Sequence, residues 1–144
     1  MSTLNKIYIS ESTDKQLRTL KIRTGLTPNL IIRIGLVFSL EEEGVVDLSL
    51  YGEDQFREFN RYTLLGEWDL LFIALLKERM NSDGFDIEQE LEIQLKSHIA
   101  RGVSSIYKRL KSVEDLSGML RTLDKKMKLN AKTLEKHKVE IENE

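Results

Sequence analysis

The pattern of apolar and polar positions changes twice within the first forty residues. Polar and apolar side chains alternate through residues 6–9, which is typical of a half-buried strand. Leu17 and Leu20 are then three residues apart, on one face of a helix. Residues 28–40 are apolar around most of a second helix, which is typical of a buried helix or a subunit interface. The sequence therefore predicts a strand followed by a helical hairpin.

Residues at the ends of these elements support the same boundaries. Ser10 offers an N-cap oxygen to the first helix. Gly25 stands where a helix C-cap needs a positive φ. Thr27 is placed to cap the second helix, and Pro28 occupies its first position, where a missing N–H costs nothing. Periodicity and capping thus indicate the same hairpin.

The rest of the pattern predicts helices and no second strand. We expect a short helix over residues 53–62 and a strongly apolar helix over residues 67–80 that forms the centre of the core. Another helix is capped by Asp86 and is broken or kinked at Gly102. The predicted fold class is all-α: a compact helical bundle opened by a short strand.

From residue 113 the spacing of apolar residues alternates between three and four, as in the seam of a coiled coil. The seam positions are Val113, Leu116, Leu120, Leu123, Met127, Asn130, Leu134, His137 and Ile141. Two of them are polar, which weakens the second half of the seam. We therefore predict two parts, a helical domain over residues 1–112 and a C-terminal coiled-coil-like helical extension over residues 113–144.

Charge is distributed in blocks, although the net formal charge of the chain is only −2. Residues 1–40 carry a net charge of +4 and residues 93–112 carry +5, whereas residues 41–92 carry −11. An acidic chain would ordinarily be a poor ligand for nucleic acid. Attraction to DNA depends on the local potential, however, and the two basic blocks lie outside the acidic middle.

Lysine and arginine bind DNA phosphates by charge and need no sequence reading to do so. We predict DNA contact by the residues of the two basic blocks, which are Lys6, Lys15, Arg18, Lys21, Arg23, Lys96, Arg101, Lys108, Arg109 and Lys111.

Little else in the sequence suggests chemistry. The absence of cysteine excludes disulfides, thiol nucleophiles and cysteine-ligated metals. There is no P-loop, dinucleotide fingerprint or nucleophile elbow. His98 and His137 lack metal-ligand spacing, and we interpret His98 as a packed structural histidine. We expect no catalytic residue, no metal, no cofactor and no enzymatic activity.

A mixed-charge stretch between residues 57 and 67 is interpreted as a structural polar network. Arg57 and Arg61 are four residues apart on the predicted short helix, where Glu58 is placed to pair with Arg61. The network would hold neighbouring aromatic residues, and Trp68 is expected to lie in the core.

The first ten residues lack the apolar region of a signal peptide. The longest apolar run, Leu70–Leu76, is too short to span a bilayer. We therefore expect a cytoplasmic protein that has no membrane partner.

Three blocks of the sequence stand out, QLRTLKIRTGLTPN (Gln16–Asn29), REFNRYTLLGEWD (Arg57–Asp69) and HIARGV (His98–Val103). Together they resemble the DndE family of DNA sulfur-modification proteins. The blocks occur in family order, and the resemblance covers residues 4–112. It implies a role in phosphorothioation, in which sulfur replaces a non-bridging oxygen of the DNA backbone.

The resemblance also implies partners. DndE-like proteins act beside a sulfur-transfer subunit and an ATPase subunit, and they form helical homo-tetramers that bind nicked double-stranded DNA through a lysine-rich surface. They carry no known catalytic residues. We therefore predict a DNA-binding accessory subunit whose apolar helix is shared between copies. The predicted oligomer interface comprises Leu30, Ile31, Ile34, Val37 and Phe38.

Two alternatives remain open at this point. The order strand, helix, turn, helix also fits a ribbon-helix-helix regulator, which would read bases of an operator from Lys6, Tyr8 and Ser10. The chain could instead be an assembly subunit that docks the partner proteins without binding DNA.

Overall fold

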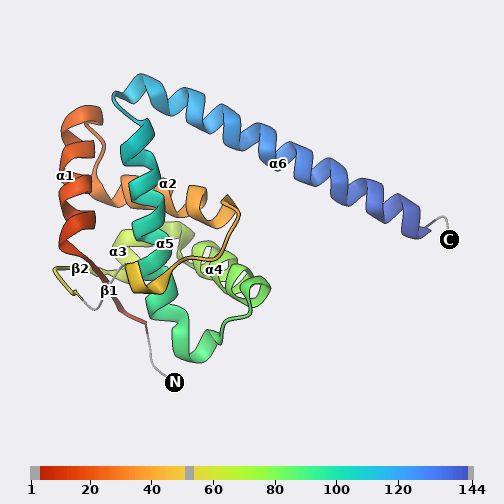
Figure 1. Ribbon diagram of the computed structural model, residues 1–144, viewed down its shortest axis with the longest axis horizontal. Helices are drawn as coiled ribbons and strands as arrows, with labels where there is room; N and C mark the ends of the chain where they lie inside the picture. Colours follow the sequence, from red (N-terminus) through yellow and green to blue (C-terminus); the bar gives the residue numbers. More distant parts are fainter. Residues whose placement is uncertain (1–3, 51–53, 143–144) are drawn as a thin grey trace. The chain divides into compact units, whose positions relative to one another are not determined.

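The computed structural model describes residues 4–50 and 54–142 (Figure 1). The chain divides into two compact units, one ending at residue 111 and one beginning at residue 112. The elements in chain order are β1 (Lys6–Ile9), α1 (Glu11–Thr24), α2 (Pro28–Glu41), the 3-10 helix η1 (Leu48–Leu50), β2 (Arg57–Asn60), α3 (Arg61–Leu65), the 3-10 helix η2 (Gly66–Trp68), α4 (Asp69–Asp83), α5 (Ile87–Arg109) and α6 (Val113–Glu142). The prediction of a mostly helical fold is confirmed.

The predicted hairpin is confirmed together with its caps. Ser10 Oγ accepts a hydrogen bond from the backbone N–H of Thr13 at the start of α1. At the end of α1, Gly25 has a φ of +74°, a left-handed conformation that glycine adopts at no steric cost. Thr27 Oγ accepts from the backbone N–H of Leu30 at the start of α2. Local sequence therefore defines where both helices begin and where α1 ends.

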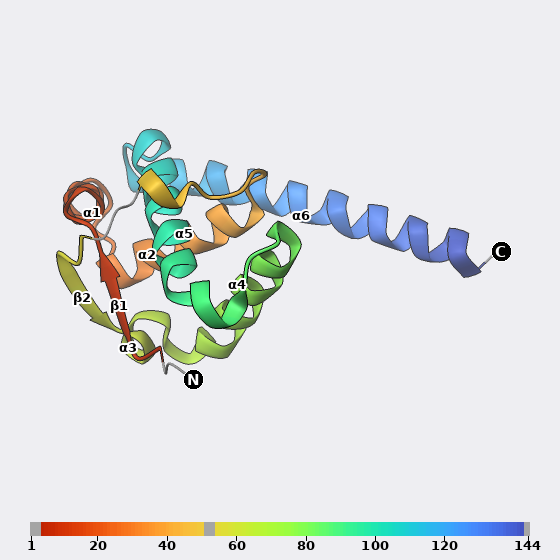
Figure 2. The same cartoon turned by 60° about the horizontal axis from the view of Figure 1, so that its bottom comes forward.

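The prediction of a helix over residues 53–62 is wrong for residues 54–60, while residue 53 lies outside the described residues. Residues 57–60 form β2, which pairs antiparallel with β1 so that Ile7 lies opposite Phe59 (Figure 2). This four-residue strand is stabilised by its pairing with β1, about fifty residues away in sequence. The local pattern of apolar residues therefore does not predict it. A ribbon-helix-helix protein instead pairs its strand with that of a second copy. Because β1 takes its partner from its own chain, this alternative loses its structural basis.

The helix α5 lies at the centre of the first unit, where it contacts α1, α2, α4 and β1 (Figure 2). It is continuous, so the predicted break at Gly102 is wrong. Gly102 instead lets α5 touch α2, because a Cβ built at this residue would lie 1.9 Å from the carbonyl oxygen of Gly35. The glycine therefore serves close helix packing and leaves the helix intact.

The helix α4 is not the central core helix that the sequence predicts. Ile73, Leu76 and Met80 are buried, but Leu70 is 81% exposed. Trp68, which was expected in the core, is 53% exposed at the start of α4. The apolar run is therefore divided between a buried face and an exposed apolar face. That exposed face comprises Trp68, Leu70, Leu71 and Leu75.

The predicted oligomer interface on α2 is only partly accessible. Ile31 is 1% exposed and belongs to the core of its own chain, which is a correction to the prediction. Leu30 is 40% exposed, while Ile34, Val37 and Phe38 are half-buried. Part of the apolar surface of α2 packs against α5, and the helix also contacts α1, α3 and α4. The interface stays a prediction for the other four residues.

The second unit contains α6, which begins where the heptad begins. The backbone N–H of Ser112 donates to Asp115 Oδ2 at its start. Val113, Leu120 and Met127, three of the predicted seam residues, are between 43% and 49% exposed. Across the described part of the chain, no helix combines the length and the apolarity that crossing a bilayer requires.

Candidate nucleic-acid interface

The fold brings one cation from each basic block to the same side chain, that of Tyr107. Arg23, in the last turn of α1, donates from Nη1 to the backbone oxygen of Tyr107 near the end of α5, at 3.1 Å. Its guanidinium carbon also lies 4.8 Å from the centre of the Tyr107 ring, within cation–π range. Lys111 approaches the same ring at 5.9 Å. The ends of α1 and α5 therefore lie side by side, although they are 84 residues apart in sequence (Figure 1).

We call the cations of α1 and of the end of α5 the basic edge. Lys15, Arg18 and Lys21 are spaced three apart on α1, so they share one helix face. Lys15 pairs with Glu11 at 3.5 Å and is 74% exposed, so this pair leaves most of its charge facing water. The basic edge comprises Lys15, Arg18, Lys21, Arg23, Lys108, Arg109 and Lys111.

Helix dipoles also favour this placement. The last turn of α1 carries Lys21 and Arg23, and the last turn of α5 carries Lys108 and Arg109. Cations in a last turn stabilise the negative end of a helix by about 0.3–1 kcal/mol. The side chains of Lys21, Lys108 and Arg109 nevertheless make no hydrogen bond or ion pair within the described residues. Their donors are therefore open to an anion.

Three predicted DNA-binding residues are engaged in contacts within the chain. Lys6, on β1, forms an exposed ion pair with Glu58 at 3.1 Å, and the hydrogen bond and charge of Glu58 raise the pKa of its ammonium group. Lys96 is 8% exposed, and its Nζ donates to the backbone oxygen of Asp54 at 2.6 Å. Arg101 is bound within the unit as described next. We therefore assign Lys96 and Arg101 structural roles and leave all three residues out of the basic edge.

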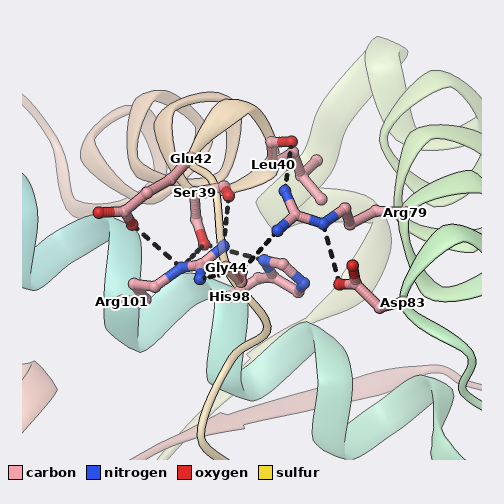
Figure 3. Close-up of polar contacts among 8 residues, drawn as sticks. All are labelled: Ser39, Leu40, Glu42, Gly44, Arg79, Asp83, His98 and Arg101. Atoms are coloured by element: carbon pink, nitrogen blue, oxygen red, sulfur yellow. Dashed lines mark hydrogen bonds and ion pairs between the residues drawn. The ribbon is translucent and has the colours of Figure 1, made fainter.

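Arg101 closes the C-terminal end of α2 (Figure 3). Its Nη2 donates to the backbone oxygen of Ser39 at 2.7 Å, and its Nε donates to Ser39 Oγ at 2.9 Å. Its Nη1 donates to the backbone oxygen of Gly44 at 2.7 Å, and Nε lies 3.1 Å from a carboxylate oxygen of Glu42. The last carbonyls of a helix lack partners within the helix, and a planar guanidinium supplies several donors at once.

Arg79 of α4 binds the same chain segment from the other side (Figure 3). It donates to the backbone oxygens of Leu40 at 2.9 Å and Gly44 at 2.6 Å, while Asp83 pairs with its Nε at 2.9 Å. The Gly44 carbonyl thus accepts from two guanidinium groups. Nothing in the apolar pattern of α4 predicts this contact. Together the two arginines connect α2, α4 and α5.

His98 lies between these arginines and is completely buried. Its Nδ1 is 2.8 Å from Ser39 Oγ. Burial lowers the pKa of the imidazole to about 4, and the nearby charges of Arg101 and Arg79 act in the same direction. The interpretation of His98 as a packed structural histidine is confirmed. A protonated imidazole would be the third cation of this cluster.

The low pKa of His98 predicts a pH dependence of stability. In the unfolded chain His98 takes up a proton near its ordinary pKa of 6.5, whereas the folded chain resists protonation down to about pH 4. This stabilising contribution is complete above pH 6.5 and is lost as the pH falls from 6.5 to 4, and it amounts to about 3 kcal/mol. Urea denaturation across this range should show a smaller loss for His98→Asn than for the parent. Equal losses would contradict the assignment.

The mixed-charge stretch is a structural network, as predicted, but its partners differ from the predicted ones. Arg57 Nη1 binds Asp14 at 2.9 Å, and Asp14 is 1% exposed. Arg61 holds both carboxylate oxygens of Asp69, at 2.8 and 2.9 Å. The predicted helical pairing of Arg57, Glu58 and Arg61 is wrong because residues 57–60 are a strand. The network ties β2 to α1 and α3 to α4.

The fold and the site define a small, mostly helical protein. A short strand precedes a helical hairpin, and cations lie near the ends of α1 and α5. A family model described as DNA sulphur modification protein DndE matches residues 6–114. The chain belongs to the DndE family, and this membership connects it with DNA phosphorothioation.

Solved structures agree with this assignment. DndE from Escherichia coli B7A, described as involved in DNA phosphorothioation modification, is 26% identical with a TM-score of 0.61, and the match covers 73% of this chain and 98% of that chain. A glycine-to-lysine double mutant of DndE is 22% identical with a TM-score of 0.60, over 73% and 99% of the two chains, and shows the shared fold. Comparison with curated protein sequences gave no match. Most of α6 lies beyond the residues that the family model matches.

Proposed function

We propose that this chain is a DNA-binding accessory subunit of a DNA phosphorothioation system, and that it binds the backbone of nicked duplex DNA without catalysis of its own. The observation that supports this proposal is the joining of two basic blocks at the basic edge through the contact of Arg23 with Tyr107. Phosphate binding needs cations gathered in space, and the basic edge supplies seven.

The chemistry of the chain supports an accessory role. Sulfur carried as a cysteine persulfide requires a cysteine, and the sequence has none. From its membership of the DndE family we propose that a sulfur-transfer subunit and an ATPase subunit are its protein partners. A purified chain incubated with DNA and a sulfide source should leave the mass of the DNA unchanged. Sulfur incorporation by the chain alone would overturn the accessory role.

Reversing two charges of the basic edge should weaken DNA binding strongly. In the double variant Lys21→Glu/Lys108→Glu, we expect at least a tenfold loss of affinity for a nicked duplex at moderate salt. The slope of log affinity against log salt concentration should decrease in magnitude by about two, because each lost phosphate contact contributes about 0.9 to that slope. Fluorescence anisotropy at several salt concentrations measures both quantities.

The matched control for this experiment is Lys77→Glu, which reverses an exposed charge on α4, away from the basic edge. It should bind DNA nearly as well as the parent. If the double variant binds like Lys77→Glu, the basic edge is not the interface. If the parent prefers an intact duplex of particular sequence over a nicked one, backbone binding is the wrong mechanism.

We propose in addition that several copies act together, because weak phosphate contacts add when one assembly carries several of them. A homo-tetramer would use the accessible part of α2, which includes Leu30 and Ile34. Ile34→Asp should yield a smaller particle by light scattering, with intact helical circular dichroism and reduced DNA affinity. A folded monomer that retains full affinity would refute this mechanism.

A second candidate function is an assembly subunit, and the exposed apolar face of α4 favours it. Exposed apolar surface of this kind often marks a protein-binding site. Leu71→Asp/Leu75→Asp should then release the sulfur-transfer or ATPase subunit in a pull-down while DNA binding persists. Intact subunit binding by this variant would remove the basis for the candidate.

A further inference from the structure

A small polar cavity lies beside the last two turns of α5. Its volume is about 230 Å³, and it is lined by Glu42 of the α2–η1 connection and by five residues of α5: Arg101, Ser104, Ser105, Lys108 and Arg109. The structure records no hydrogen bond or ion pair for the side chains of Ser104, Ser105, Lys108 and Arg109 among the residues it describes. Two hydroxyl groups, an ammonium group and a guanidinium group therefore face one space.

The charge of this cavity is positive. Arg101, Lys108 and Arg109 bring three positive charges, and the one carboxylate, that of Glu42, already pairs with Arg101 at 3.1 Å. The dipole at the C-terminal end of α5 disfavours anions, so the side chains alone must supply the attraction. Arg101 is held by its contacts with α2 and Gly44, which keeps its charge fixed in the wall.

The volume of the cavity restricts the ligand. Sites for drug-sized molecules usually exceed about 300 Å³, whereas one water occupies about 30 Å³ in the liquid. A hollow of about 230 Å³ is below the usual size of a site for a drug-sized molecule and is large enough for a phosphate group with a few waters. Its donors suit the same group, because hydroxyl, ammonium and guanidinium groups all donate to phosphate oxygens.

We propose that this cavity binds a terminal phosphate monoester, the 5′-phosphate at a nick in duplex DNA. A monoester carries a charge of about −1.5 to −2 at neutral pH and presents three oxygens at its open end. A phosphodiester within a strand carries one charge and has sugars on both sides, so it offers the donors of the cavity less charge and fewer free oxygens than a monoester does. This inference rests on the proposed function, and it explains why a nick would be preferred.

The test uses three DNA dumbbells of one sequence, whose hairpin ends leave no terminus except at the nick. One is continuous, one has a nick with a 5′-hydroxyl, and one has a nick with a 5′-phosphate. We expect the 5′-phosphate nick to bind about tenfold more tightly than the 5′-hydroxyl nick, because the phosphate accepts charge-assisted hydrogen bonds from the cavity. Inorganic phosphate at high concentration should abolish the preference. Lowering the pH through about 6, where the monoester takes up a proton, should reduce it.

The variant Ser104→Ala/Ser105→Ala separates the cavity from general attraction to DNA. It removes two donors, keeps every charge and places a better helix former at each position. It should lose the preference for the 5′-phosphate while binding the continuous and 5′-hydroxyl dumbbells like the parent. Ser117→Ala, an exposed position on α6, is the matched control and should keep the preference.

The outcomes are distinguishable. Equal affinity for the two nicked dumbbells overturns the cavity inference and leaves backbone binding intact. A preference that survives in the double serine variant also overturns it, because the cavity donors would then be irrelevant. Failure of the parent to bind any of the three dumbbells overturns the proposed function together with the inference.

Discussion

Gly102→Ala is expected to lower the free energy of unfolding by about 3 kcal/mol or more, because the added Cβ has the closest backbone contact of those at the described glycines. The new Cβ would lie 1.9 Å from the oxygen and 2.3 Å from the carbon of the Gly35 carbonyl group. Backbone atoms cannot move aside as a flexible side chain can. Relief of the overlap would require α2 and α5, the most extensive helix contact of the unit, to separate.

Urea denaturation followed by circular dichroism measures this effect. Gly118→Ala is the matched control, because Gly118 is exposed in α6 and a Cβ there meets no atom within 4 Å. That substitution should stabilise helix formation by about 0.5–1 kcal/mol, since alanine is the better helix former. Gly35→Ala should fall between the two, because its Cβ would lie 3.0 Å from Val103 N. Unchanged stability of Gly102→Ala would mean that the two helices do not approach this closely.

Arg101→Lys is expected to destabilise the chain by about 2–4 kcal/mol, although it conserves the charge. A lysine ammonium is a point donor on a flexible stem, and it cannot serve the Ser39 and Gly44 carbonyls together as the guanidinium does. The Ser39 carbonyl would keep the Glu42 N–H and the Gly44 carbonyl would keep Arg79, but each would lose a hydrogen bond to a charged donor, which costs about 1.5–3 kcal/mol.

The same denaturation experiment tests this second prediction. Lys128→Ala, which removes an exposed ion pair with Asp124, is the control and should change the stability by less than about 0.5 kcal/mol. Arg79 shares the Gly44 carbonyl with Arg101, so substitutions at these two positions should not be additive in a double-mutant cycle. A cost for Arg101→Lys as small as that of the control would show that Arg101 does not hold the end of α2.

The sequence blocks that resemble the DndE family are mainly structural in this fold. The first block contains the turn at Gly25 and the cap of α2. The second contains Arg61 with its partner Asp69. The third contains His98, Arg101 and the close approach at Gly102. The second and third blocks therefore specify how the helices meet. The first block also contributes three of the seven cations of the basic edge, Arg18, Lys21 and Arg23, and the other four lie outside all three blocks.

The candidate site was predictable only in part. Seven of the ten cations predicted to bind DNA lie on the basic edge, but charge pattern alone could not distinguish Lys108 from Lys96, whose ammonium group is buried against Asp54. It also could not identify Asp14 as a buried anion that binds Arg18 and Arg57. Lysines and arginines look alike in sequence whether they face water or close a helix end.

The sequence by itself determined the helical hairpin, its caps, the start of α6 and the structural character of His98. The hairpin, its caps and the start of α6 depend on residues within one or two turns of each other, where capping and periodicity act. Only the tertiary structure decided the strand β2, the exposure of α4, the role of Gly102 and the meeting of Arg23 with Tyr107. Each of these depends on a neighbour far along the chain or on which face of a helix finds a packing partner, and both are set by how the whole chain packs.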